Sequence, residues 1–195
     1  MRIIGGTARG RKLFTPPLHE QCIRPTSDRA REALFNILGK RVDDATVLDL
    51  FAGTGALGLE AYSRNARFTV FIDNHPLALK LIRKNILHCI GDHSGDREIR
   101  VIQHDLTRNI PYKKLPQETH SGFDVIFADP PYAKDMSISV LKFINNSSLL
   151  RPNGLLIVEE RHTIDLPSSL SSLERIDRRV YGEAAFFFYR SSVAP

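Results

Sequence analysis

The segment of residues 46–64 constrains the fold more than any other part of the chain. Its first five residues, Thr46-Val47-Leu48-Asp49-Leu50, have the apolar and β-branched composition of a buried strand. Gly53, Gly55 and Gly58 follow at the spacing G-x-G-x-x-G, and a helical pattern follows them. In this order the glycines permit a tight turn and let a ligand approach the backbone closely. The segment therefore predicts an α/β fold with a nucleotide-type ligand at the loop.

Further strands and helices alternate along the chain. We expect strands near residues 46–50, 67–72, 98–102, 123–128 and 154–159, with helices near 56–64, 76–88 and 136–145. Residues 172–190 are typical of two antiparallel strands that close the sheet. This alternation predicts a Rossmann-like, mostly parallel seven-stranded sheet with helices on both faces.

The chain before this sheet has a different character. Residues 2–14 contain turn glycines and precede two prolines, which predicts an N-terminal β-hairpin extension. A helix is expected from Asp28 to about Gly39. Its predicted buried face is formed by Ala30, Ala33, Leu34, Ile37 and Leu38. Arg29 and Arg31 lie off this face, so we expect both to meet a ligand or water.

Composition places the chain among single-domain globular proteins. At 195 residues and 42% hydrophobic content it can bury a core. We expect one domain, in which residues 1–26 form the hairpin and a basic extension and residues 27–195 form the Rossmann-like core. The sequence has neither an apolar stretch of about 18 residues nor a signal-peptide core. Cys22 and Cys89 are too few for a disulfide framework, which indicates a reducing cytoplasm.

The tetrapeptide Asp129-Pro130-Pro131-Tyr132 follows a buried strand and suits a flat group with an exocyclic amine. Such an amine offers two N–H donors, and a carboxylate with a backbone carbonyl can accept both. Pro131 restricts the backbone of Pro130 and so aims its carbonyl in a fixed direction. Tyr132 can stack on a base. A plain proline turn with a surface acid is the alternative for this segment taken alone.

Four acids stand at the predicted strand ends. Since ligands of open α/β sheets bind beyond the carboxyl ends of the strands, Asp49, Asp73, Asp105 and Asp129 are expected to line one cleft. Asp49 suits the cationic amino-acid end of S-adenosylmethionine, and Asp73 suits ribose hydroxyls. For Asp105, two roles remain open: accepting the cofactor's adenine amine, or capping a short helix. The glycine loop alone fits a nicotinamide or flavin cofactor equally well.

These motifs resemble the RsmD family, bacterial methyltransferases that act on guanine N2 of 16S small-subunit ribosomal RNA. The resemblance covers nearly the whole chain. It is carried by Arg2-Ile3-Ile4-Gly5-Gly6, Arg9-Gly10-Arg11-Lys12-Leu13, Arg24-Pro25-Thr26-Ser27-Asp28-Arg29, Arg31-Glu32-Ala33-Leu34-Phe35-Asn36, the segment from Asp49 to Ala61 and the Asp129 box. The loop and the box are shared by many amino-methyltransferases, whereas the N-terminal segments are more specific to this family.

The resemblance implies a class I, S-adenosylmethionine-dependent methyltransferase whose substrate is 16S ribosomal RNA, within a small-subunit particle or an assembly intermediate. The implied catalytic residues are Asp129, Pro130, Pro131 and Tyr132. The implied cofactor-binding residues are Asp49, Phe51, Gly53, Gly55, Asp73 and Asp105. No metal is expected: His88, Cys89, Asp92 and His93 are of metal-ligand types, but their spacing matches no zinc site.

The charge of the chain is concentrated at its start. Residues 1–31 hold seven basic and two acidic residues, and removing them from totals of 27 and 22 leaves 20 of each. The whole excess of +5 therefore lies in this segment, as phosphate binding beside a base pocket would require. The predicted RNA-binding residues are Arg2, Arg9, Arg11, Lys12, Arg24, Arg29 and Arg31. A solvated basic face is the alternative.

Other functions remain open at this point. An adenine-N6 methyltransferase acting on DNA or RNA would use the same box, and a dinucleotide-dependent oxidoreductase would use the glycine loop but leaves the box unexplained. A pure RNA-binding module is a further alternative. For methyl transfer we expect direct attack by the amine, with no covalent enzyme intermediate.

Overall fold

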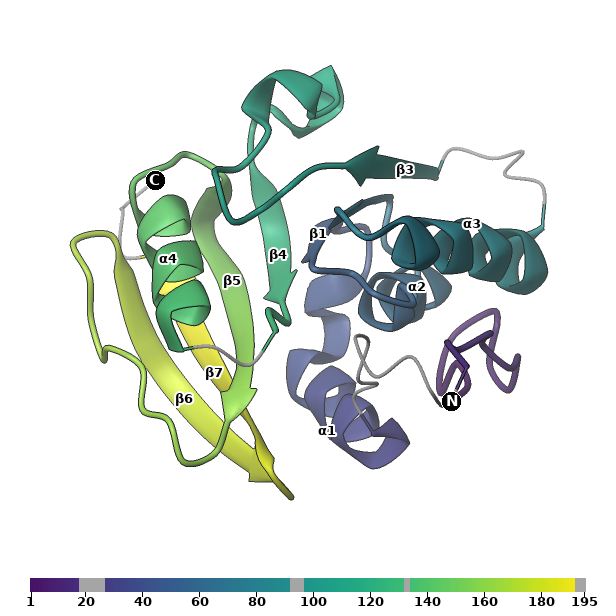
Figure 1. Ribbon diagram of the computed structural model, residues 1–195, viewed down its shortest axis with the longest axis horizontal. Helices are drawn as coiled ribbons and strands as arrows, with labels where there is room; N and C mark the ends of the chain where they lie inside the picture. Colours follow the sequence, from purple (N-terminus) through teal and green to yellow (C-terminus); the bar gives the residue numbers. More distant parts are fainter. Residues whose placement is uncertain (18–26, 92–96, 132–133, 192–195) are drawn as a thin grey trace.

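The computed structural model describes residues 1–17, 27–91, 97–131 and 134–191. In these ranges the strands form a seven-stranded sheet in the order β3-β2-β1-β4-β5-β7-β6 (Figure 1). The strands are β1 (Thr46–Leu50), β2 (Phe68–Asp73), β3 (Glu98–Gln103), β4 (Phe123–Ala128), β5 (Leu150–Arg161), β6 (Leu173–Tyr181) and β7 (Ala184–Ser191). Strands β1 to β5 pair in parallel, and β7 is antiparallel to both neighbours. The predicted mostly parallel sheet is confirmed.

Helices cover both faces of the sheet, as predicted. They are α1 (Asp28–Leu38), α2 (Ala56–Ser63), α3 (Pro76–Ile90) and α4 (Lys134–Asn145), with short 3₁₀ turns at Gly39–Val42, Tyr112–Lys114 and Gln117–Thr119. Leu34 of α1 packs with Val47 and Phe127 of the sheet, whereas Leu141 of α4 packs with Leu48 on the other face. None of the described helices has the length and apolar character needed to cross a membrane.

Strand β5 is longer than the predicted 154–159. It starts at Leu150, and its pairing with β4 shifts between Phe123 and Val125, where the register jumps from Leu150 to Leu155. The extra residues include Asn153, which has φ of 62°. A bulge with polar residues interrupts the apolar pattern, so the first third of the strand carries no clear strand signal in sequence.

Helix α1 presents a different face to the core from the one predicted. It begins after Ser27, whose hydroxyl accepts from the Ala30 amide, and ends at Gly39 as expected. However, Ile37 is 42% exposed, while Phe35 is buried and packs against Phe127 with ring centroids 5.7 Å apart. The prediction placed Ile37 inside because it assumed one apolar stripe, but the helix is covered from two sides, by the sheet and by α2 with the hairpin.

The predicted N-terminal hairpin is present. Arg2 and Lys12 form an antiparallel bridge, and the Leu13 amide donates to the Met1 carbonyl at 3.1 Å. The hairpin packs on α2: the carboxylate of Glu60 accepts from the amides of Ile4 and Gly5, each at 2.8 Å. Because Glu60 lies one turn after the glycine loop, this contact ties the N-terminal extension to the helix that follows the loop.

Candidate active site

The glycine loop and the Asp129 box lie on the same edge of the sheet. Strand β1 pairs directly with β4, so Leu50 is in register with Ala128, and the Asp129 amide donates to the Leu50 carbonyl at 3.4 Å. The strand order changes direction between β1 and β4, because the chain returns there after adding β2 and β3 on the other side. A crevice at such a switch point is the usual ligand site of open α/β sheets.

The backbone of the glycine loop is unusual. Gly53, Gly55 and also Phe51 have φ of 55°, 78° and 57°, a region that residues with a Cβ adopt only at some cost in free energy. At Gly58 an added Cβ would lie 2.4 Å from the ring of Phe71. The loop therefore needs glycine at 53 and 55 for its turn and at 58 for close packing of α2 on the sheet.

Asp49 joins the loop to the strand before it. Its side chain is 2% exposed, and Oδ2 accepts from the Gly58 amide at 2.9 Å. Burial raises its pKa to about 8 against the opposing effect of the Gly58 hydrogen bond, and the charge of Asp73 adds to the rise. A buried carboxylate that is costly to ionise gains from a cationic ligand, which is what the predicted role of Asp49 requires.

Asp73 organises the turn after β2. Its Oδ2 accepts from the Gly53 amide at 2.9 Å and its Oδ1 from the His75 amide at 2.8 Å. The acid therefore holds the glycine loop beside the end of β2. Its predicted contact with ribose hydroxyls stays a prediction.

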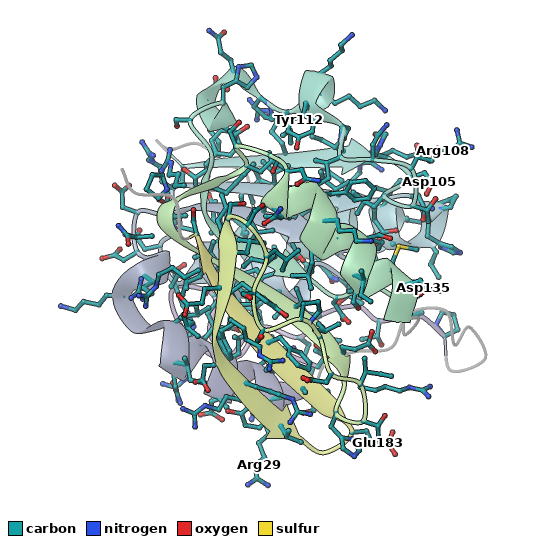
Figure 2. The ribbon with its side chains drawn as sticks, turned by 90° about the vertical axis from the view of Figure 1, so that its left-hand side faces the viewer. Arg29, Asp105, Arg108, Tyr112, Asp135 and Glu183 are labelled. Atoms are coloured by element: carbon teal, nitrogen blue, oxygen red, sulfur yellow. The ribbon has the colours of Figure 1, made fainter. Side chains whose placement is uncertain are left out.

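Asp105 follows β3 and caps a turn rather than a helix. Its Oδ1 accepts from the Thr107 amide at 3.0 Å and from the Thr107 hydroxyl at 2.7 Å, and Arg108 lies 3.3 Å from Oδ2 (Figure 2). The Thr107 hydrogen bonds lower its pKa. Asp105 also lines a small cavity, so the cofactor contact stays a prediction beside the observed capping.

This small cavity of about 70 Å³ lies beside the turn after β3 and is bordered by Phe51, before the glycine loop, and by Pro131 of the box. Its lining residues are Phe51, Asn74, His104, Asp105, Leu106, Thr107, Pro131 and Met136. They come from the ends of β1, β2 and β3, from the box and from α4. Three residues predicted for the cofactor or the substrate, Phe51, Asp105 and Pro131, therefore line one space.

The box itself opens from the core towards solvent. Pro130 is buried, Asp129 is partly exposed and Pro131 is exposed, while Tyr132 lies outside the described residues. Burial raises the pKa of Asp129 well above its ordinary value, and the charges of Glu159, Asp49 and Glu160 raise it further. The carboxylate is therefore more basic than that of an ordinary surface aspartate.

Glu159 and Glu160, at the end of β5, are buried acids whose charges act on Asp129 and to which the sequence alone assigned no role. They are 4% and 1% exposed. Glu160 accepts from the Ser137 hydroxyl of α4 at 2.7 Å and from the Arg161 amide at 2.8 Å. Their position at the end of a parallel strand could have indicated from sequence that they reach the same edge as Asp129.

Most of the described basic residues of the N-terminal segment are accessible. Arg9 and Lys12 are exposed, and the Arg2 side chain is 69% exposed, 4.0 Å from Asp28. Arg11 is also exposed and donates to the His88 carbonyl at 2.8 Å. Arg29 projects outward from α1 (Figure 2). The predicted RNA contact of Arg24 lies outside the described residues.

The predicted RNA contact of Arg31 is wrong. Its side chain is 0% exposed and cannot reach RNA. It donates to the Arg2 carbonyl and to Asp28, and its Nε lies 3.9 Å from Glu60. Burial lowers its pKa against the opposing effect of these two acids. The prediction was wrong because the side of α1 facing away from the sheet is covered by the hairpin, which the spacing of apolar residues does not reveal.

A family model described as "Conserved hypothetical protein 95" matches residues 1–190. The chain belongs to this family. The resemblance to the RsmD methyltransferases is thereby confirmed, since curated proteins with the name ribosomal RNA small subunit methyltransferase D align with the chain.

Several relatives of this chain are named as methyltransferases. The putative rRNA methyltransferase YlbH of Bacillus subtilis is 30% identical over 97% of this chain and 98% of its own length. The ribosomal RNA small subunit methyltransferase D of Escherichia coli is 32% identical over 97% and 89%, and that of Haemophilus influenzae is 35% identical over 82% and 78%. These names favour a methyltransferase over an oxidoreductase.

Solved structures agree on the fold of this family. The putative methyltransferase yhhF of Escherichia coli has a TM-score of 0.78 and 30% identity, covering 100% of this chain and 99% of its own. An RNA methyltransferase of Salinibacter ruber, crystallised with S-adenosylhomocysteine, has a TM-score of 0.62 at 15% identity over 88% and 97%. The Rossmann-like methyltransferase fold is therefore shown.

Proposed function

We propose that this protein transfers a methyl group from S-adenosylmethionine to the exocyclic N2 amine of a guanine in small-subunit ribosomal RNA. The observation that carries the proposal is the pairing of β1 with β4, which puts the glycine loop and the Asp129 box at adjacent strand ends. A methyl donor held at the first and an amine held at the second lie side by side. The names of the relatives support ribosomal RNA as the substrate.

The residues present fit S-adenosylmethionine. The ammonium of its amino-acid end and its sulfonium are cationic, and the neighbouring strands end in buried acids, of which Asp49 bonds to the Gly58 amide after the loop. The left-handed backbone at Phe51, Gly53 and Gly55 forms a close-fitting turn. We assign Asp49, Phe51, Gly53 and Gly55 to the cofactor's amino-acid end and Asp73 and Asp105 to its nucleoside. The cofactor supplies an electrophilic methyl group, so the chemistry needs no metal-bound nucleophile.

The box orients and activates the amine. Guanine N2 is a poor nucleophile because its lone pair is delocalised into the ring. The Asp129 carboxylate and the Pro130 carbonyl accept its two N–H groups, turn the lone pair towards the methyl group and stabilise the positive charge that grows on nitrogen. Such interactions are commonly worth about 3–4 kcal/mol. The raised pKa of Asp129 also suits it to take up the proton that the amine loses after transfer.

The basic hairpin holds the RNA backbone beside this site. Met1 lies next to the glycine loop, because its Sδ accepts from the Thr54 hydroxyl at 3.8 Å. Arg2, Arg9, Arg11 and Lys12 are exposed on the same hairpin. Phosphates near the target nucleotide would therefore meet positive charge while the base enters the crevice. We assign the cytoplasm as the place of action and a small-subunit particle or assembly intermediate as the substrate.

One labelling experiment tests the whole proposal. The protein is incubated with S-adenosylmethionine carrying a tritiated methyl group and with naked small-subunit ribosomal RNA, assembly intermediates or finished particles. The RNA is then digested and the labelled nucleoside is identified by mass. Label in N2-methylguanosine supports the proposal. Label in N6-methyladenosine shows the adenine alternative instead, and the absence of label in every substrate contradicts methyl transfer to ribosomal RNA.

A further inference from the structure

Three carboxylates stand near one another at the edge that carries the proposed site. Strand register places Leu50 beside Ala128 and Ala128 beside Val158, so Asp129 and Glu159 follow at equivalent positions of neighbouring strands. Neighbouring strands are about 4.8 Å apart. Asp129 and Glu159 are therefore direct neighbours across β4 and β5, whereas Asp49 of β1 is in register with Phe127, two residues before Asp129.

All three side chains belong to the same face of the sheet. Val47, Phe127 and Ile157 pack in the cluster beneath α1, and the three acids each follow one of these residues by two positions. Because side chains alternate along a strand, residues two apart share a face. Glu160 has the parity of Val158, which packs in the cluster beneath α4, and it bonds to Ser137 of that helix. Glu160 therefore belongs to the opposite face.

The proximity of Asp129 and Glu159 has an electrostatic consequence. After burial, the charge of Glu159 is the largest cause of the raised pKa of Asp129. Two carboxylates at this separation repel each other when both are ionised. A ligand that brings hydrogen-bond donors to both at once relieves this repulsion. The pair is therefore suited to a planar group with neighbouring N–H donors.

We propose that Glu159 reads the guanine ring by accepting the N1–H while Asp129 and the Pro130 carbonyl hold the N2 amine. Guanine presents N1–H and N2–H donors side by side, whereas adenine presents a lone pair on N1 next to its amine. A carboxylate at Glu159 accepts from the first and repels the second. Glu159 is thus the residue that selects guanine over adenine, a role that rests on the proposed function and names its base-specificity determinant.

The test uses an RNA substrate in which the mapped guanosine is replaced by 2-aminopurine. This base keeps the exocyclic amine at C2, but its N1 bears a lone pair and no hydrogen. For the wild-type protein we expect kcat/KM for 2-aminopurine to fall about 10- to 100-fold below that for guanine, the range for a lost hydrogen bond to a charged group. Equal rates on the two substrates would overturn the inference without any variant.

Two variants then assign the discrimination to one residue. In Glu159→Gln the amide N–H can donate to N1 of 2-aminopurine, so the ratio of the two kcat/KM values should shrink at least about fivefold. Glu160→Gln is the matched control, a neighbouring buried carboxylate on the other face, and should keep the wild-type ratio. An unchanged ratio in Glu159→Gln, or an equally large decrease of the ratio in Glu160→Gln, contradicts the proposed role of Glu159.

This outcome is separable from failure of the proposed function. If no N2-methylguanosine forms in the labelling experiment, the assignment of the substrate is wrong. If N2-methylguanosine forms but the wild-type protein has equal kcat/KM for guanine and 2-aminopurine, the proposed function is supported and Glu159 is not its specificity determinant. Folding of each variant is checked by its thermal transition, and the wild-type measurement decides if neither variant folds.

Discussion

The amino edge of the sheet and the carboxyl ends of β1, β4 and β5 use acidic residues in opposite ways. At the amino edge, Asp124 is paired with Arg151 at 2.8 Å and accepts from the Thr46 amide, and Asp44 lies 3.6 Å from Arg67. These pairs line a hollow of about 470 Å³ that contains none of the predicted site residues. At the carboxyl edge, the charges that act on Asp129 come from other acids.

This difference shows that the larger of two hollows is not necessarily the functional site. Paired charges at a partly exposed surface are close to neutral in free energy and hold loops in place. Buried acids that raise one another's pKa store unfavourable free energy, which a cationic or donor-rich ligand releases. We therefore locate function at the carboxyl edge, although the cavity found there is the smaller.

The largest expected effect separates the two edges directly. Asp129→Ala should lower the rate of methyl transfer about 10²- to 10³-fold, because it removes the acceptor that stabilises the developing charge. Cofactor affinity, measured by calorimetry, should change little. Asp124→Ala at the amino edge is the control and should stay within a few-fold of the wild-type rate. More than about a tenth of the wild-type rate in Asp129→Ala would contradict electrostatic activation of this size.

The pH dependence of cofactor binding tests the acid that stands beside the glycine loop. Asp49 has a pKa of about 8 in the unliganded protein, so it is mostly protonated at pH 6 and ionises as the pH rises. A cationic cofactor prefers the ionised form. Affinity should therefore increase from pH 6 to pH 8, by at most about tenfold per unit. Asp49→Asn should flatten this dependence, and a flat wild-type profile would show that Asp49 does not face the cation.

Two arginines of α1 sharpen the contrast between buried and exposed charge. Arg31→Ala should lower the free energy of unfolding by about 1–3 kcal/mol, because a buried guanidinium with hydrogen bonds to Arg2 and Asp28 is lost. Arg29→Ala, at an exposed position of the same helix, should change stability by less than about 0.5 kcal/mol. Chemical denaturation measures both. Equal losses would mean that the burial of Arg31 does not matter energetically.

The smallest expected effect concerns the hairpin. Joint replacement of Arg9, Arg11 and Lys12 by alanine should flatten the dependence of log RNA affinity on log salt by about 0.7–0.9 for each lost phosphate contact. Filter binding across a range of salt concentrations gives the slope. Cofactor affinity should be unchanged. If the slope also stays the same, these side chains do not contact phosphate.

Local patterns in the sequence were sufficient for much of the fold. Strands β1, β2, β3 and β4 agree with the expected ranges to within about one residue, and Pro76 begins α3 as predicted. These elements are set by periodicity over a few residues and by glycine or proline at their ends. The position of the candidate site could be predicted from the same local patterns, because the carboxyl ends of parallel strands lie at one edge of the sheet.

The wrong prediction for Arg31 and the missing prediction for Glu159 have a common physical origin. Whether Arg31 is buried depends on the hairpin that covers it, and whether Glu159 matters depends on which strand lies beside β4. Both are contacts between segments far apart in the chain: Arg31 meets the Arg2 carbonyl, and Ala128 is in register with Val158. Spacing along one helix or strand says which residues share a face, but not what packs against that face.

The chain's own residue pattern settled which elements form, where the glycine loop turns and which acids end the strands, since each of these is decided by neighbours in sequence. The packed fold decided the rest: which arginine is enclosed, which acids meet, and therefore which carboxylate becomes basic. Burial and proximity shift a pKa and set the cost of a charge, and they exist only once distant segments have come together.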